Sequence, residues 1–95
     1  MSDDILTTTV PLTRRLTHDG KVYNSLTIRE ATVADQLDAI TPGMGQAEGE
    51  IALVAHLASV PVAVITKVRL VDYRKVQTVV ANFPYPPEEA STTTS

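Results

Sequence analysis

The stretch Glu48-Gly-Glu-Ile-Ala-Leu-Val-Ala-His-Leu-Ala-Ser-Val60 decides how the rest of this chain folds. Its apolar residues recur with the period of an α-helix and cover more than half of the helix circumference. They are Ile51, Leu53, Val54, Leu57, Ala58 and Val60. A helix this apolar needs cover on several sides, and within 95 residues the flanking segments must supply it. We therefore expect one small core centred on this helix, which Pro61 ends.

Upstream, apolar residues alternate along two segments on either side of Asp19-Gly20, which is typical of a β-hairpin. The apolar positions are even-numbered in both segments, so a two-residue turn would scatter them over both faces. We therefore predict a three-residue loop, His18-Asp19-Gly20, with Gly20 at positive φ. This register pairs Leu16 with Val22, Leu12 with Leu26 and Val10 with Ile28.

Helical signals follow the hairpin. Thr32 and Asp35 have the spacing of a capping pair, and Val33, Leu37 and Ile40 form a stripe that we expect to cover the apolar face of the hairpin. Thr41-Pro-Gly-Met-Gly45 then breaks the helix.

The C-terminal part contains one clear and one ambiguous segment. The spacing of Leu70, Tyr73, Val76 and Val80 predicts a helix that ends near Asn82. The β-branched content of Val62-Ala-Val-Ile-Thr-Lys-Val-Arg69 favours a strand, whereas Pro61 and the lack of a partner strand favour a short helix. We favour the helix.

These elements predict an α+β fold, in which a small N-terminal antiparallel hairpin packs on a bundle of three to four short helices. We expect a single domain over residues 9–83 and disordered segments at residues 1–8 and 84–95, where polar residues and prolines dominate.

Composition excludes several functional classes. The net charge is −3, and the lysines and arginines are scattered singly, so we expect no nucleic-acid partner. The absence of cysteine excludes a disulfide framework and thiolate metal sites. No apolar run reaches the ~18 residues of a membrane span, and the acidic start of the chain does not resemble a signal peptide. We therefore expect a cytosolic protein that does not bind membranes.

Candidate catalytic and metal-binding residues do not form recognisable patterns. His18 and His56 lack helical ligand partners, and Glu48 and Glu50 do not face one another on a helix. The remaining candidates, Gly43-Met-Gly45, Ser25, Ser59 and Tyr73, lie outside any phosphate-loop or nucleophile motif. We therefore predict no catalytic, cofactor-binding or metal-binding residue, no cofactor and no enzymatic activity, and a protein that binds another protein.

Four segments in order carry a resemblance to a known family. They are Leu26-Thr-Ile-Arg-Glu-Ala-Thr-Val-Ala-Asp35, Glu50-Ile-Ala-Leu-Val-Ala-His-Leu57, Val60-Pro61 and Leu70-Val-Asp-Tyr-Arg-Lys-Val-Gln77. Together they resemble the tail assembly chaperones of Mu-like tailed bacteriophages over about Lys21 to Val80. Ala31 stands where that family commonly has proline.

The resemblance implies an assembly factor in the host cell cytoplasm that binds the tape-measure protein and keeps it soluble until the tail tube polymerises. It also implies the tail-tube protein as a possible further partner, and in such phages a frameshifted longer form often accompanies the short one. Alternatives are a small structural tail protein or tail completion component and, more remotely, a regulatory domain.

The partner surface is predicted from apolar residues that one small core cannot absorb. They cluster in the C-terminal third: Val62, Val64, Val68, Val79 and Phe83. We expect the tape-measure protein, or a second copy of this chain, to dock there.

Overall fold

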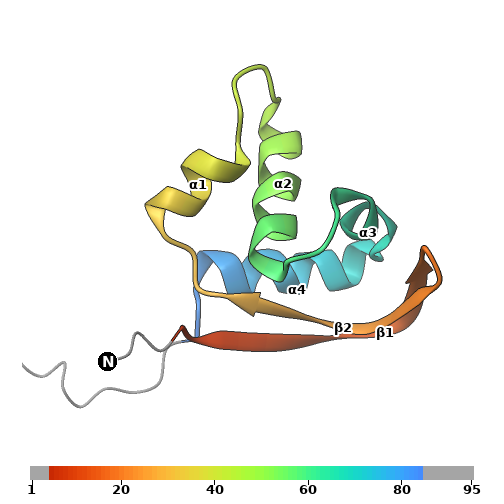
Figure 1. The fold of residues 1–95 in the computed structure, drawn as a ribbon. Helices are drawn as coiled ribbons and strands as arrows, with labels where there is room; N and C mark the ends of the chain where they lie inside the picture. Colours follow the sequence, from red (N-terminus) through yellow and green to blue (C-terminus); the bar gives the residue numbers. More distant parts are fainter. Residues whose placement is uncertain (1–4, 85–95) are drawn as a thin grey trace, which may run out of the picture.

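The computed structural model describes residues 5–84, and it contains a β-hairpin followed by four helices. The elements are β1 (Thr7–His18), β2 (Lys21–Arg29), α1 (Val33–Ala39), α2 (Gln46–Ala58), α3 (Val62–Lys67) and α4 (Leu70–Ala81). Figure 1 shows all four helices on the same side of the hairpin. The predicted α+β class is confirmed, and the ambiguous segment after Pro61 is a helix. β1 begins at Thr7, so the strand includes two residues that we assigned to an N-terminal tail; residues 1–4 and 85–95 lie outside the described residues.

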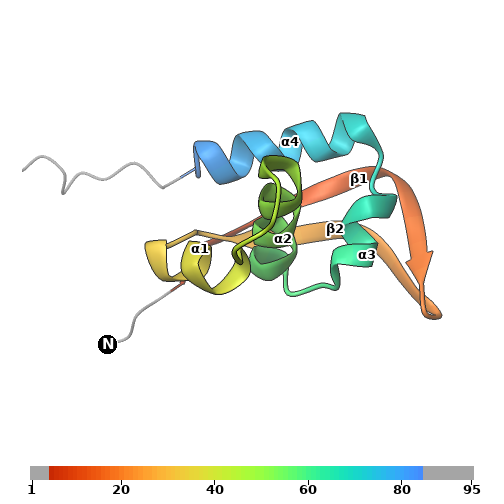
Figure 2. The same cartoon turned by 90° about the horizontal axis from the view of Figure 1, so that it is seen from above.

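Helix α2 is the centre of the core, as its sequence predicts. Val54, Ala55 and Leu57 are buried, and α2 contacts α1, α3, α4 and β2. Val10, Leu26 and Ile28 supply the apolar face of the hairpin against the helices, while α4 contributes Val76. Viewed from above, α4 runs beside β1 (Figure 2). Helix α2 ends at Ala58, because Ser59 takes the left-handed conformation, and Pro61 is the N-cap of α3.

The predicted hairpin register is wrong. Asp19 and Gly20 both have positive φ, and His18 pairs with Lys21, so the turn has two residues and type I′ geometry. At the other end Val10, and not Leu12, pairs with Leu26. Between the two ends the register shifts: four residues of β1 (12–15) separate the pairs Pro11–Ser25 and Leu16–Tyr23, whereas β2 has only Asn24 between them.

A side chain from α4 accounts for this irregularity. The Thr13 backbone N–H and hydroxyl both donate to Asp72 Oδ2, at 3.0 and 2.9 Å. The Thr13 N–H therefore has a hydrogen-bond partner outside the β1–β2 ladder. The extra residues of β1 form a bulge that shifts the register, so that Val10 faces the helices on the far side of the bulge. The two-residue turn and the buried apolar face are compatible because of this bulge.

Gly20→Val is expected to lower the free energy of unfolding by about 1 kcal/mol or more. Gly20 has φ +77° with open space around it, so the cost comes from the backbone conformation that a β-branched residue tolerates poorly. Urea unfolding measures the effect. Asp19→Asn is the control, because asparagine accepts the positive φ of Asp19 (51°). Equal stabilities of the valine variant and the unaltered chain would contradict the turn assignment.

Helix α1 does not cover the hairpin as predicted. Val33 and Leu37 are 76 % and 75 % exposed, whereas Ile40 packs toward α2 at Gly49. The reason is Asp35, which is buried and two residues from both Val33 and Leu37. Residues two apart lie on nearly opposite faces of a helix, so turning Asp35 inward turns the apolar pair outward.

Candidate protein-binding groove

A polar cluster fixes where α1 sits. Asp35 accepts two hydrogen bonds from the Arg29 guanidinium, Nη2 to Oδ1 at 2.6 Å and Nη1 to Oδ2 at 2.8 Å. Thr32 and Asp35 form the predicted capping box, and His56 Nε2 lies 3.1 Å from Asp35 Oδ1. The bonds from Arg29 and then Thr32 hold the pKa of Asp35 well below its usual range, although burial acts in the opposite direction. The cluster therefore ties α1 to both β2 and α2.

The two histidines lie far apart in the chain and have different partners. His56 belongs to the Asp35 cluster, and His18 Nδ1 lies 3.2 Å from Lys67 Nζ at the hairpin tip. Within residues 5–84 no three His, Cys, Asp or Glu side chains come together as metal ligands would. None of the helices in this part of the chain has the length and apolar character of a membrane span.

Asp72 is a buried carboxylate that the sequence does not reveal as such. Burial raises its pKa, but the hydrogen bonds from Thr13 and the charge of Lys75, whose Nζ lies 3.6 Å from Oδ1, outweigh this effect and lower the pKa overall. The carboxylate therefore stays ionised and joins α4 to the irregular part of β1.

The residues predicted to form a partner surface divide into three groups. Val62 is 49 % exposed, and Val68, Val79 and Phe83 are half-buried. Val64 is fully buried, so the expectation that it is part of a surface is wrong. Val64 is at the third position of the short helix α3, which turns this residue toward the interior, whereas Val62 at its start stays outside.

Two adjoining hollows form an apolar groove across α2, α3 and the start of α4, and Val62 is on its wall. One hollow, about 280 Å³, lies between α2 and α3; the other, about 320 Å³, extends to α4. The lining residues are Met44, Glu48, Ile51, Ala52 and Val62, then Ile65, Val68, Leu70 and Tyr73, with Ile51 and Thr66 shared. We call this surface the α2–α4 groove.

The α2–α4 groove exposes large apolar side chains. Leu70 is 62 % exposed, Val62 49 % and Met44 37 %, while Ile51 is partly buried against the core. The sequence analysis placed Ile51 in the core and Leu70 only in the last helix, and it missed their shared groove. The sequence does contain a local indication that Val62 and Leu70 are exposed. Each is the first residue of a helix, where fewer residues of the same helix surround a side chain.

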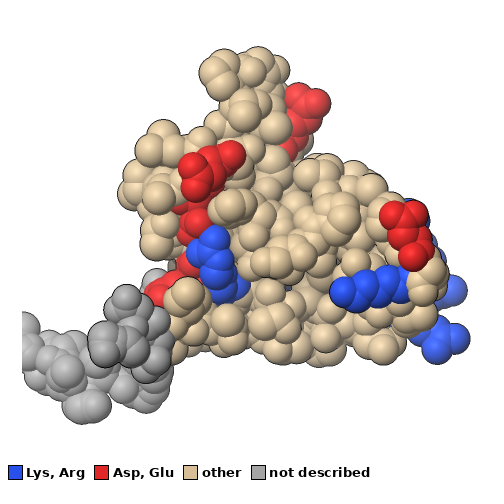
Figure 3. All heavy atoms as spheres, viewed as in Figure 1, with Lys and Arg blue, Asp and Glu red and all other residues tan. Residues whose placement is uncertain are grey.

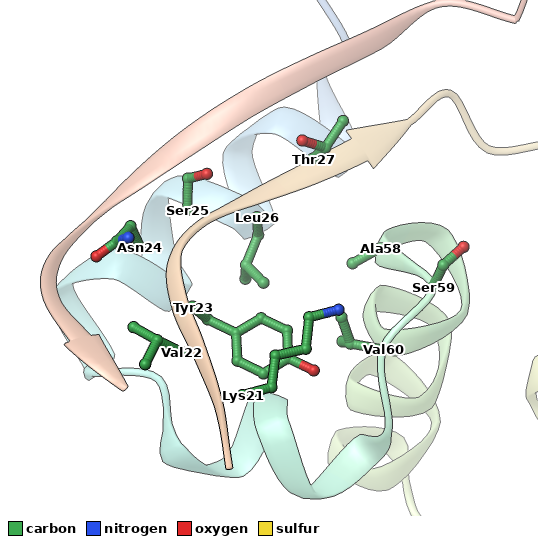
Figure 4. A pocket seen from close by; sticks show the side chains of 10 residues that line it. All are labelled: Lys21, Val22, Tyr23, Asn24, Ser25, Leu26, Thr27, Ala58, Ser59 and Val60. Atoms are coloured by element: carbon green, nitrogen blue, oxygen red, sulfur yellow. The ribbon is translucent and has the colours of Figure 1, made fainter. Parts of the chain in front are cut away.

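A further hollow of about 360 Å³ lies between β2 and the end of α2. Figure 4 shows Tyr23, Leu26 and Val60 pointing into it, while Asn24 and Ser25 point away. Lys21 Nζ lies 5.2 Å from the centre of the Tyr23 ring. The lining of this hollow includes Lys21 and Tyr23 and contains no carboxylate or imidazole.

Charges are distributed unevenly over the molecule. Figure 3 shows Lys and Arg side chains at the hairpin tip, beside an acidic side chain, and again below α1, while other Asp and Glu side chains lie over α1 and the upper end of α2. Most of the face between them is uncharged. Such a surface suits contacts with protein better than contacts with the continuous negative charge of nucleic acid.

Tyr73→Phe is expected to leave the free energy of unfolding unchanged or to raise it by up to about 1 kcal/mol. The Tyr73 hydroxyl is buried and has no hydrogen-bond partner among the described residues, so its removal relieves a desolvation cost. Burial first, and then Glu50, raise the pKa of Tyr73, so the hydroxyl remains protonated. Chemical denaturation measures the change, with Tyr23→Phe as control. A loss of stability above about 1 kcal/mol would show that the hydroxyl has a partner.

The chain matches a model of a known protein family. The family model described as "Phage tail assembly chaperone proteins, E, or 41 or 14" matches residues 9–84. No curated protein and no solved structure matches the chain. The matched range includes almost the whole hairpin, all four helices and every residue that lines the α2–α4 groove. The chain therefore belongs to the phage tail assembly chaperone family.

Proposed function

We propose that this protein binds the tape-measure protein through the α2–α4 groove and keeps it soluble before the tail tube polymerises, without catalysis and in the host cytoplasm. Family membership supports an assembly role, and the observation that carries the rest is the exposure of Leu70, Val62 and Met44 along a concave apolar surface. Apolar patches of this kind mark protein interaction sites.

The physical role is to cover apolar surface that would otherwise aggregate. A long helical protein that presents apolar stripes in water associates with other copies of itself, and each bound chaperone removes part of a stripe from contact with water. The domain has a longest extent of 47 Å, so a client several times longer requires several copies. The tail-tube protein is then a competitor that replaces the chaperone during assembly.

Co-expression with the tape-measure protein tests this function. We expect the unaltered chain to make the tape measure soluble and to co-purify with it, and the Val62→Asp, Leu70→Asp double variant to lose both effects. Both side chains are substantially exposed, so the fold tolerates the change. Val22→Asp with Val33→Asp is the matched control, since these valines are 50 % and 76 % exposed outside the groove. Equal activity of the groove variant would exclude the groove as the site.

A small structural tail protein is the alternative, and the outer edges of the hairpin favour it, because an edge strand can pair with another chain. Mass spectrometry of purified virions separates the two functions. We expect the chain to be absent from finished particles. Its presence there in stoichiometric amounts would favour the structural role.

A further inference from the structure

The walls of the α2–α4 groove offer few hydrogen-bonding groups. Thr66 Oγ1 already donates to the Ala63 carbonyl at 2.8 Å, and Glu48 Oε1 accepts from the Gly45 N–H at 2.9 Å. The Tyr73 hydroxyl is buried. The lining residues come from helices and their connections, and none of them belongs to β1 or β2.

An extended peptide in this groove would leave its backbone N–H and C=O groups without partners, which is costly away from water. A helix satisfies these groups internally and presents only side chains to the apolar walls. The occupant that fits is therefore an amphipathic helix.

The two ends of the groove carry different charges. Glu48 is part of the lining at the α2 end. Neither arginine near the α4 end is part of the lining, but exposed Arg69 directly precedes Leu70, and exposed Arg74 follows Leu70 by one helical turn. Lys67 does not add to this set, because its Nζ lies at the hairpin tip, where it donates to the Thr17 carbonyl at 3.1 Å.

The α4 end remains positive when neighbouring groups are included. Glu50 acts electrostatically on Tyr73 and offsets part of the charge of the two arginines. The start of α4 adds the positive end of its helix dipole. Lys75 and Asp72 lie 3.6 Å apart and largely compensate each other. The groove thus has a negative charge in its lining at the α2 end and is bordered by a net positive charge at the α4 end.

We propose that the groove selects an amphipathic helix that carries acidic residues at the α4 end and basic residues at the Glu48 end, and that this charge pattern fixes the direction in which the client lies. The inference rests on the proposed function of the groove. Apolar contact supplies the affinity, while the charges set the orientation and discriminate against clients of the reverse pattern.

Two stapled helical peptides provide the probe. Both carry a leucine stripe and lysines in the last turn, and the first turn contains glutamates in one and glutamines in the other. We expect the unaltered chain to bind the glutamate peptide about tenfold more tightly at low salt, and this preference to fall toward unity at about 1 M salt, where the Debye length is about 3 Å. Fluorescence anisotropy measures both dissociation constants.

Charge reversal locates the effect. Arg69→Glu with Arg74→Glu is expected to abolish the preference, whereas Arg14→Glu with Arg15→Glu, an identical charge change at exposed residues of β1, is expected to keep it. Equal binding of both peptides by the unaltered chain, or equal effects of the two double variants, would overturn the inference. If either result is found but Val62→Asp with Leu70→Asp abolishes peptide binding, the charge preference is wrong while the groove remains the binding site. If this variant binds both peptides normally, the proposed function falls as well.

Discussion

Leu57→Ala is expected to lower the free energy of unfolding by about 2–5 kcal/mol. Leu57 is 2 % exposed at the centre of the core cluster, so truncation removes apolar contacts and leaves a cavity that its neighbours fill only in part. Small domains have total stabilities of roughly 5–15 kcal/mol, and this loss is a large share of that range. Urea unfolding followed by circular dichroism measures it.

Leu37→Ala is the matched control for this prediction. It makes the same chemical change in another helix, but Leu37 is 75 % exposed, and we expect a change within about 0.5 kcal/mol. Coincident urea midpoints for Leu57→Ala and the unaltered chain would show that α2 is not the centre of the core.

Asp35→Ala is expected to destabilise the protein on the order of 2 kcal/mol at neutral pH. The substitution removes the partner of the Arg29 guanidinium and half of the capping box of α1. Asp38→Ala, in the same helix at an exposed position, controls for the loss of a carboxylate. We expect α1 to separate from α2 and β2 first, which faster hydrogen exchange in residues 33–39 would reveal.

The contribution of Asp35 depends on pH in a predictable direction. Its pKa is lower in the folded chain than in the unfolded chain, so its stabilising effect is fully present above the unfolded value near 4 and is lost as the pH falls below it. The difference in stability between Asp35→Ala and the unaltered chain should therefore shrink between about pH 5 and pH 2. A constant difference over this range would contradict the ionised, hydrogen-bonded state of Asp35.

The class of fold and the central helix follow from local patterns, and these predictions are confirmed. The apolar pattern in α2 and α4 repeats over several helical turns, so a single exception does not obscure it. The capping pair Thr32 and Asp35 and the end of α4 at Asn82 are local as well, because the atoms that interact there lie within a few residues of each other.

The register of the hairpin and the orientation of α1 depend on contacts between distant residues, and the sequence does not show them. Thr13 and Asp72 are 59 residues apart, yet their hydrogen bonds decide where β1 bulges. Asp35 and His56 are 21 residues apart, and with Arg29 they decide which face of α1 is buried. Periodicity shows that a helix has an apolar stripe, but in α1 a buried carboxylate determines which side of the helix faces the core.

The same distinction explains what could be predicted of the candidate site. A surplus of apolar residues in the C-terminal third is visible in the sequence, and Val62 and Val68 do line the α2–α4 groove. The contributions of Met44, Ile51 and Leu70 depend on how α2, α3 and α4 meet. Val33 and Leu37 form a second exposed apolar pair on α1, outside the groove.

These two apolar surfaces allow the most direct test of the account. Methyl-labelled protein titrated with the tape-measure protein reports on each valine and leucine separately. We expect the methyl resonances of Val62, Val68 and Leu70 to shift on binding, while those of Val33 and Leu37 stay in place. Shifts confined to Val33 and Leu37, with the groove methyl groups unchanged, would contradict the assignment of the α2–α4 groove as the client-binding site.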